Sequence, residues 1–303
     1  MNRRPVIISI LIVGIVAVSF ASIFIKLIGS ANPIVITLWR LVFSSMIIVP
    51  IGIAILGRRL VDIVLKHGKV LTLSGFFLSV HFFFWIASLA YTSVASSVVI
   101  VTTNPVWVGI GSYLIYREKI TKSIMVGIGL TVIGGAIIGF GDFSVSPRTL
   151  FGDGLALCGA FIASGYLLVG KKARKSLSIL EYITPVYTIA AAFALVFCLF
   201  LSLDLTGYTP RIFLLLLALA IVPQLIGHTT FNWALGVMPA SLVAVAIVGE
   251  PVGSTVLAYF ILGEKLTMAK MIGGGIIISG IMTSMWGGGR SEGENKSFFG
   301  GKI

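Results

Sequence analysis

Ten long apolar runs separated by short connections constrain this chain more than any other feature. Each run is about 20 residues long, the length with which an α-helix crosses the hydrocarbon core of a bilayer. Unpaired backbone groups are costly in hydrocarbon, so such a chain folds as an all-α bundle of transmembrane helices. The runs cover roughly residues 5–28, 33–56, 70–91, 95–116, 123–141, 152–170, 179–202, 211–233, 239–262 and 268–287.

The composition agrees with an integral membrane protein. Of the 303 residues, 57% are hydrophobic and 11% are charged, whereas a soluble domain carries about 25% charged residues. The net charge of +12 would suggest nucleic acid in a soluble protein, but here the basic residues lie between the apolar runs. We therefore expect the lipid bilayer as a partner and no nucleic acid.

The distribution of basic residues predicts the orientation. If residue 1 lies inside, sixteen Lys and Arg residues fall in inner segments and five in outer segments, with Arg40 inside a run. Cytoplasmic loops carry such an excess. We expect a multi-pass plasma-membrane protein with both termini cytoplasmic and with residues 288–303 forming a disordered cytoplasmic tail.

The chain also carries an internal duplication at an offset of 146 residues. Apolar bias alone would align Ile and Val, but it would not align Pro, Glu, Lys and Gly in one register. The register pairs Pro105 with Pro251, Glu118 with Glu264, Lys26 with Lys172, and Gly127, Gly129 and Gly134 with Gly273, Gly275 and Gly280. We interpret residues 5–141 and 152–287 as two five-helix repeats.

The odd number of spans in each repeat makes the two copies enter the membrane from opposite sides. The fold class expected is therefore ten transmembrane helices arranged as two inverted-topology five-helix repeats. In folds of this kind the substrate site lies near the bilayer midplane, between the repeats.

Glu250 is the principal candidate for chemistry. It precedes Pro251 in the middle of the ninth run, and Asn104 with Pro105 takes the mirrored place in the fourth. A carboxylate at the centre of a membrane helix costs roughly 2.5–3.5 kcal/mol, so it should face a cavity or a partner. We expect Glu250 and Asn104 to bind an amine group of a substrate or a coupling proton, with Pro105 and Pro251 as helix breaks. The alternative is a structural acceptor for backbone groups that Pro251 frees.

Other polar and aromatic residues within the runs are weaker candidates for substrate binding. Arg40 could anchor an anion, keep Glu250 ionised, or extend outward to the headgroups. His81 and Trp85 are one helical turn apart and share a face. The ordinary interpretation of such residues is hydrogen-bonded core or an interfacial belt. The remaining candidates are Trp39, His228 and Asn232.

The glycine-rich fifth and tenth runs favour close helix packing, either to a neighbouring span or to a second protomer of a homo-oligomer. They are not preceded by a strand, so they do not indicate a phosphate loop. The sequence contains no metalloprotease, nucleophile-elbow or Walker motif. We expect no enzyme, no cofactor and no metal, and any active transport to be secondary. A small pore and an intramembrane enzyme remain as alternatives from other classes.

These features resemble the EamA-type members of the drug/metabolite transporter superfamily. The resemblance rests on Lys26, on Pro105 with Glu118, on Glu250-Pro251 with Glu264, and on the glycine-rich fifth and tenth runs, and it covers nearly all of residues 5–287. It implies a central cavity among spans 1–4 and 6–9, with spans 5 and 10 behind. It also implies a small-molecule substrate and export of amino acids or related metabolites by alternating access. The alternative is a sugar-phosphate or nucleotide-sugar exchanger.

Overall fold

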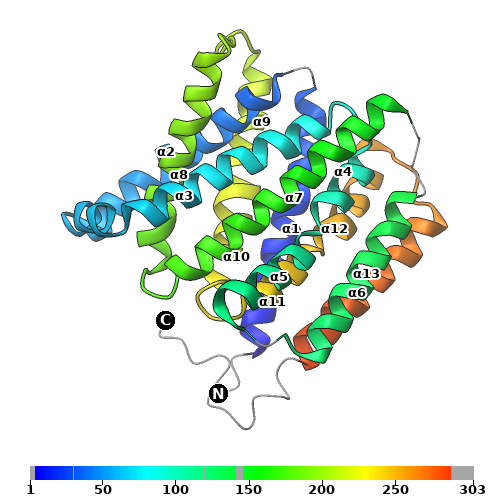
Figure 1. Cartoon of the computed structure of the whole chain (residues 1–303). Coiled ribbons are helices and arrows are strands. Elements are labelled where there is room, and N and C mark those ends of the chain that lie inside the picture. The colour runs from blue at the N-terminus through cyan, green and yellow to red at the C-terminus, as the bar shows by residue number, and fades with distance from the viewer. Residues whose placement is uncertain (1–3, 30, 119, 141–145, 288–303) are drawn as a thin grey trace.

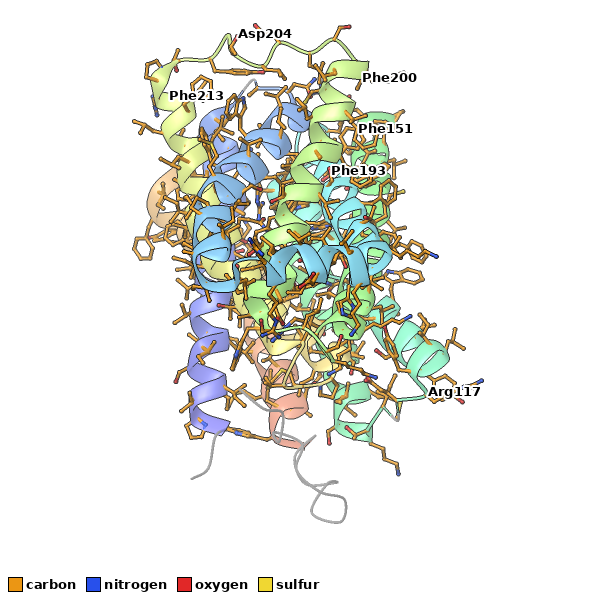
Figure 2. All side chains as sticks on the ribbon, turned by 90° about the vertical axis from the view of Figure 1, so that its left-hand side faces the viewer. Arg117, Phe151, Phe193, Phe200, Asp204 and Phe213 are labelled. Atoms are coloured by element: carbon orange, nitrogen blue, oxygen red, sulfur yellow. The ribbon has the colours of Figure 1, made fainter. Side chains whose placement is uncertain are left out.

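The computed structural model describes residues 4–29, 31–118, 120–140 and 146–287, and every span in these ranges is helical (Figure 1). The expected tail from residue 288 lies outside them. Within these described ranges, ten helical spans are long and apolar enough to cross a membrane. Large apolar side chains point outward from them: Phe200, labelled in Figure 2, is 83% exposed, as suits a lipid-facing position. The expected ten-span, all-α fold is confirmed.

Among the described residues, seven spans are single helices and three, the fourth, eighth and ninth, are interrupted. The elements are α1 (Arg4–Ile28), α2 (Pro33–Leu56), α3 (Arg59–Ser88), α4 (Val94–Val101), α5 (Asn104–Tyr116), α6 (Lys122–Phe140), α7 (Pro147–Ala173), α8 (Ile179–Phe200), α9 (Pro210–Leu219), the π-helical η1 (Ala220–His228), α10 (Thr229–Ala234), α11 (Ala240–Ile247), α12 (Glu250–Leu257), the π-helical η2 (Ala258–Leu262) and α13 (Met268–Gly287).

Two expected boundaries are wrong. The third helix begins at Arg59, eleven residues before the expected residue 70, and the sixth begins at Pro147 rather than at residue 152. The early part of α3 mixes exposed charged residues with exposed Val61 and Leu65. A helix of this kind suits the membrane interface, where hydropathy alone does not detect it.

The repeat register differs between the first helix and the rest. α1 ends at Ile28 and α7 at Ala173, an offset of 145, whereas the capping residues of α2 and α8, Asn32 and Ser178, differ by 146. The connection after α7 is therefore one residue longer than the connection after α1. The expected match of Lys26 with Lys172 is corrected by this shift, and the spatial counterpart of Lys26 is Lys171.

The glycine faces of α6 and α13 pack against each other at the edge of the bundle (Figure 1). A Cβ atom added at Gly127 would lie 2.7 Å from the Gly280 carbonyl oxygen, and one added at Gly134 would lie 2.6 Å from that of Gly273. The reciprocal distances, from Cβ atoms added at Gly280 and Gly273, are 2.9 and 2.5 Å. Of the two packing partners expected for these glycines, the structure uses the neighbouring span.

The fourth and ninth spans are broken at mirrored positions. α4 ends at Val101 and α5 begins at Asn104, while α11 ends at Ile247 and α12 begins at Glu250. Each proline follows the first residue of the new helix, where its missing N–H costs no intrahelical bond. The Thr103 N–H donates to the Ile100 carbonyl instead of the Val99 carbonyl, and the Thr102 hydroxyl donates to Val99 at 3.0 Å, which satisfies the carbonyl freed by the break.

Candidate functional site

The two helix breaks meet at a cavity of about 50 Å³ between the repeats. Residues from α1, α3, the α4–α5 break, α7, the η1–α10 segment and the α11–α12 break form its wall. They are Val18, Ala21, His81, Trp85, Val101, Thr102, Asn104, Ala163, Tyr166, Leu167, His228, Phe231, Asn232, Ile247 and Glu250. The helices α6 and α13 contribute no residue to this wall.

The cavity lies on the pseudo-two-fold axis, because its wall is built from mirrored pairs. In the 146 register Asn104 opposes Glu250, and Trp85 opposes Phe231. Val101 and Ile247 form a further pair at the offset of 146 residues. The first helices of the repeats match at an offset of 145, and there Val18 pairs with Ala163 and Ala21 with Tyr166. The two halves of the wall differ at two pairs: the second repeat has the acid Glu250 where the first has the neutral Asn104, and Tyr166 where the first has Ala21. These differences make the site asymmetric.

Serines from the opposite repeat approach both breaks. The Ser19 hydroxyl lies 3.4 Å from the Glu250 carbonyl oxygen while it also donates to its own helix at Ile15. The Ser164 hydroxyl lies 3.3 Å from the Asn104 carbonyl oxygen. Because these carbonyls precede the prolines, each break is supported across the repeat interface. Glu250 as a whole is buried, with 9% of its surface exposed.

His81 and Trp85 lie one turn apart on α3, with nearly parallel rings whose centroids are 6.3 Å apart. The Nδ1 atom of His81 is 3.0 Å from the Gly159 carbonyl oxygen. A carbonyl only accepts, so Nδ1 carries the proton, and in the neutral ring Nε2 is left as an acceptor. Within the described residues, Trp85 Nε1 and Asn104 Oδ1 are buried without a hydrogen-bond partner.

Tyr166 is the wall residue that sequence reasoning left among the core aromatics. Its hydroxyl accepts from Asn232 Nδ2 at 2.7 Å, and the same amide donates to the Tyr187 hydroxyl at 3.2 Å. Tyr187 in turn contacts Thr229 Oγ1 at 3.0 Å. This network orients Asn232 and Tyr166 toward the cavity. The sequence carried no local signal for this role, because Tyr166 is the twentieth of the 27 residues of α7 and lies away from the middle of its span.

Two candidate residues, Arg40 and Trp39, lie outside the cavity wall. Arg40 is fully buried, its Nε donates to Gln224 Oε1 at 2.9 Å, and its guanidinium lies 3.8 Å over the Phe82 ring. Trp39 donates to the Leu205 carbonyl at 2.9 Å, far along the helix toward the Asp204 end. Phe82 contacts His228 edge-on and so separates Arg40 from the cavity.

The two ends of the bundle differ in closure. At the Arg117 end (Figure 2), the Lys171 ammonium of α7 donates to the carbonyls of Leu235 and Met238 at 3.0 and 2.8 Å. Nearby, Arg174 donates to the carbonyls of Asn232 and Leu177, and Arg59 pairs with the Glu181 carboxylate at 2.7 Å.

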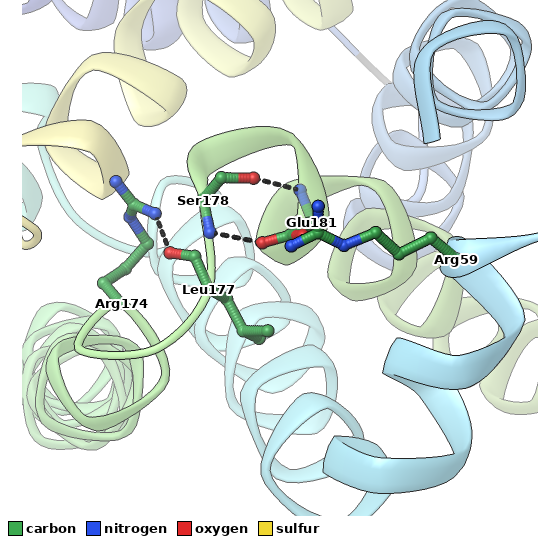
Figure 3. Close-up of polar contacts among 5 residues, drawn as sticks. All are labelled: Arg59, Arg174, Leu177, Ser178 and Glu181. Carbon is green, nitrogen blue, oxygen red and sulfur yellow. Dashed lines mark hydrogen bonds and ion pairs between the residues drawn. The ribbon is translucent and has the colours of Figure 1, made fainter. Parts of the chain in front are cut away.

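The Glu181 carboxylate also accepts from the Ser178 backbone N–H, forming a capping box at the start of α8 (Figure 3). These contacts tie α3, α7, α8 and the α10–α11 turn together at the Arg117 end. At the Asp204 end, by contrast, a cavity of about 440 Å³ is lined by Ser22, Ile25, Lys26, Gly29, Ala31, Asn32, Pro33, Ile36, Ile86, Leu89, Ala90 and Val94.

Comparison with known proteins places this geometry in a family. Uncharacterized transporter YetK from Bacillus subtilis (strain 168) is 28% identical over 204 residues, which are 64% of this chain and 61%, less than two thirds, of that protein. An uncharacterized transporter from Archaeoglobus fulgidus is 24% identical over 90% of this chain and 93% of its own length. UDP-galactose/UDP-glucose transporter 7 from Arabidopsis thaliana is 30% identical over 64% of this chain and 62% of its own.

One solved crystal structure has the same fold, with a TM-score of 0.77 at 20% identity over 93% of this chain and 97% of that one. The profile of the EamA-like transporter family matches twice, at residues 5–140 and 150–286. The two matches coincide with the two inverted halves of the bundle and cover most of its length. This chain therefore belongs to the EamA-like transporter family.

Proposed function

We propose that this transporter is a secondary exporter of amino acids or related small metabolites, and that the central cavity is its binding site. The observation that carries the proposal is the Glu250 carboxylate, which lines a cavity on the axis between inverted repeats. Sites of this kind alternate between the two sides as the repeats rock. The basic-residue bias supports cytoplasmic termini, and we place the protein in the plasma membrane as part of the proposal.

The polar groups of the wall support an amine as the recognised group. Glu250, the Nε2 atom of neutral His81 and the unpartnered Asn104 Oδ1 are acceptors. The unpartnered Trp85 Nε1 is a donor. An ammonium group satisfies the acceptors and a neighbouring carboxylate satisfies the indole, which is the pair of groups that an amino acid carries.

A nucleotide-sugar or sugar-phosphate exchanger is the second candidate. The similarity to a UDP-sugar transporter from Arabidopsis thaliana favours it. Diphosphate recognition requires several cations facing the ligand, whereas none of the residues that line the central cavity in the described parts of the chain is Lys or Arg. We therefore rank the amine substrate first.

The small volume of the cavity supports a mechanism in which the helices around it move apart to bind substrate. About 50 Å³ holds a few water molecules and no amino acid. Binding therefore requires the helix breaks to separate, and the breaks at Asn104 and Glu250 are where the backbone is not tied by continuous helical bonds. A proton on Glu250 is the coupling ion we propose.

The test compares Glu250→Gln with Asp62→Asn, which removes an exposed carboxylate on α3. Cells producing each protein are challenged with toxic amino-acid analogues, and efflux is then measured in vesicles from acidic to basic pH at matched protein level. A hydrogen bond to a charged group contributes about 1.5–3 kcal/mol, so efflux by Glu250→Gln should fall about ten- to a hundredfold. Unchanged efflux across the pH range would make Glu250 structural.

A further inference from the structure

The closed Arg117 end contains a specific contact between two elements of the second repeat. The Lys171 ammonium at the end of α7 donates to the carbonyls of Leu235 and Met238, in the turn between α10 and α11. The Glu118 carboxylate acts electrostatically on the same ammonium. Charge-assisted hydrogen bonds are among the stronger contacts in proteins, so this lysine holds the end of α7 onto the turn.

The first repeat contains the same turn with the same backbone geometry. In the second repeat, the Gly236 N–H donates to the Trp233 carbonyl, and the N–H groups of Val237 and Met238 both donate to the Ala234 carbonyl. At an offset of 146 residues, the Ala90 N–H donates to the Ala87 carbonyl, and the N–H groups of Tyr91 and Thr92 both donate to the Ser88 carbonyl. The carbonyls that receive Lys171 therefore have structural counterparts at Leu89 and Thr92.

The lysine is mirrored as well. The first helices of the repeats match at an offset of 145: Gly14 packs on Phe231 as Gly159 packs on Trp85, and Ser19 and Ser164 approach the two breaks alike. This register places Lys26 in the position of Lys171. Yet Lys26 is exposed and, with Leu89 and Ala90, lines the 440 Å³ cavity at the Asp204 end.

The two repeats thus contain equivalent elements, which are in contact at the Arg117 end of the molecule and apart at the Asp204 end. Building on the proposed function, we propose that Lys26 is a gate residue of this transporter. In the alternative conformation its ammonium binds the carbonyls of Leu89 and Thr92 and closes the Asp204 end, while Lys171 releases Leu235 and Met238. Each lysine then stabilises one of the two access states.

The C-terminal ends of the fourth and ninth spans also support an alternation between Lys171 and Lys26. Glu118 N–H donates to the Ser112 carbonyl and Glu264 N–H to that of Ala258, at 3.3 and 3.2 Å, so both helices end with the same backbone motif. Glu118 acts on Lys171, whereas Glu264 lies 3.6 Å from Lys270. When the Asp204 end closes, Glu264 acts electrostatically on Lys26 as Glu118 acts on Lys171.

The experiment reads the two ends separately. In protein whose Cys158 and Cys198 are replaced by alanine, a single cysteine is placed at Ala90 or at Val237, and its alkylation rate by a water-soluble maleimide is measured without substrate. Lys171→Met should raise the rate at residue 237 and lower the rate at residue 90. Lys26→Met should do the opposite and slow transport, and Lys26→Arg should restore both. We expect changes of about tenfold, the factor of one lost charge-assisted hydrogen bond.

Lys172→Met is the matched control, because this exposed neighbour is the partner of Lys26 by sequence register but not by position. It should shift neither rate. If Lys26→Met leaves transport and both rates unchanged, Lys26 is a solvated surface residue and the proposal fails, even if Lys171→Met does not fold. Because the alkylation rates need no substrate, loss of the Glu250 hypothesis would leave this test intact.

Discussion

The contact between α6 and α13 yields a prediction whose size follows from the geometry. In Gly134→Ala, the added Cβ would lie 2.6 Å from the Gly273 carbonyl oxygen and 2.9 Å from the backbone nitrogen of Ile277. Ordinary contacts begin near 3.4 Å. The obstacles are backbone atoms, which cannot rotate away, so the two helices must separate by a substantial part of an ångström.

Gly129→Ala on the same helix is the control, because nothing lies within 4 Å of its added Cβ. Both substitutions gain up to about 1 kcal/mol of helix propensity. Only Gly134→Ala adds an overpacking cost of about 1–3 kcal/mol. The difference between the two variants therefore isolates the packing term, and Gly134→Ala should be less stable by that amount.

The assay is thermal unfolding of the purified proteins in detergent, followed by loss of the monodisperse chromatographic peak. With about 2–4 °C per kcal/mol for domains of 150–250 residues, Gly134→Ala should melt several degrees below Gly129→Ala. The mirrored pair, Gly273→Ala with Gly275→Ala, should behave in the same way. Equal midpoints in both pairs would refute the reasoning that these glycines set the distance between the helices.

Two further predictions concern topology and the buried cation. A cysteine introduced at Asp204 should react with an impermeant maleimide added outside cells, and one at Arg117 should react only from the cytoplasmic side; the reverse pattern would contradict the orientation. Arg40→Met should keep the folded yield, because an apolar side chain of similar length removes the desolvation cost of a buried ion. Its efflux should still fall by about tenfold if the charge acts on the cavity, and normal efflux would assign Arg40 to packing with Phe82 and Gln224.

Much of the fold could be predicted because its determinants are local. The length of an apolar run shows that it crosses the bilayer, and a duplication with five spans per copy requires inversion. The depth of Glu250 and Asn104 within their runs, together with the repeat register, indicated that both lie near the axis. The glycine spacing predicted a packing face on α6 and α13, although not which surface would meet it.

The candidate site was predictable only in part, because depth along a helix does not specify the direction in which a side chain points. Arg40 and Trp39 lie within the second span, yet α2 packs on α3, α8 and η1, so their side chains meet Gln224 and Leu205 instead of the cavity. Tyr166 reaches the cavity because of how α7 packs, which no local pattern records.

What the sequence determined by itself was therefore the number of spans, their inversion and the central pair of Asn104 and Glu250. The tertiary structure decided which residues line the cavity, which lysine of the second repeat is equivalent to Lys26, and which end of the bundle is closed. The physical reason is rotational: one residue turns a side chain by about 100° around a helix. A single extra residue after α7 therefore makes Lys171, and not Lys172, the counterpart of Lys26. Only the packing between helices sets the direction in which each of these side chains points.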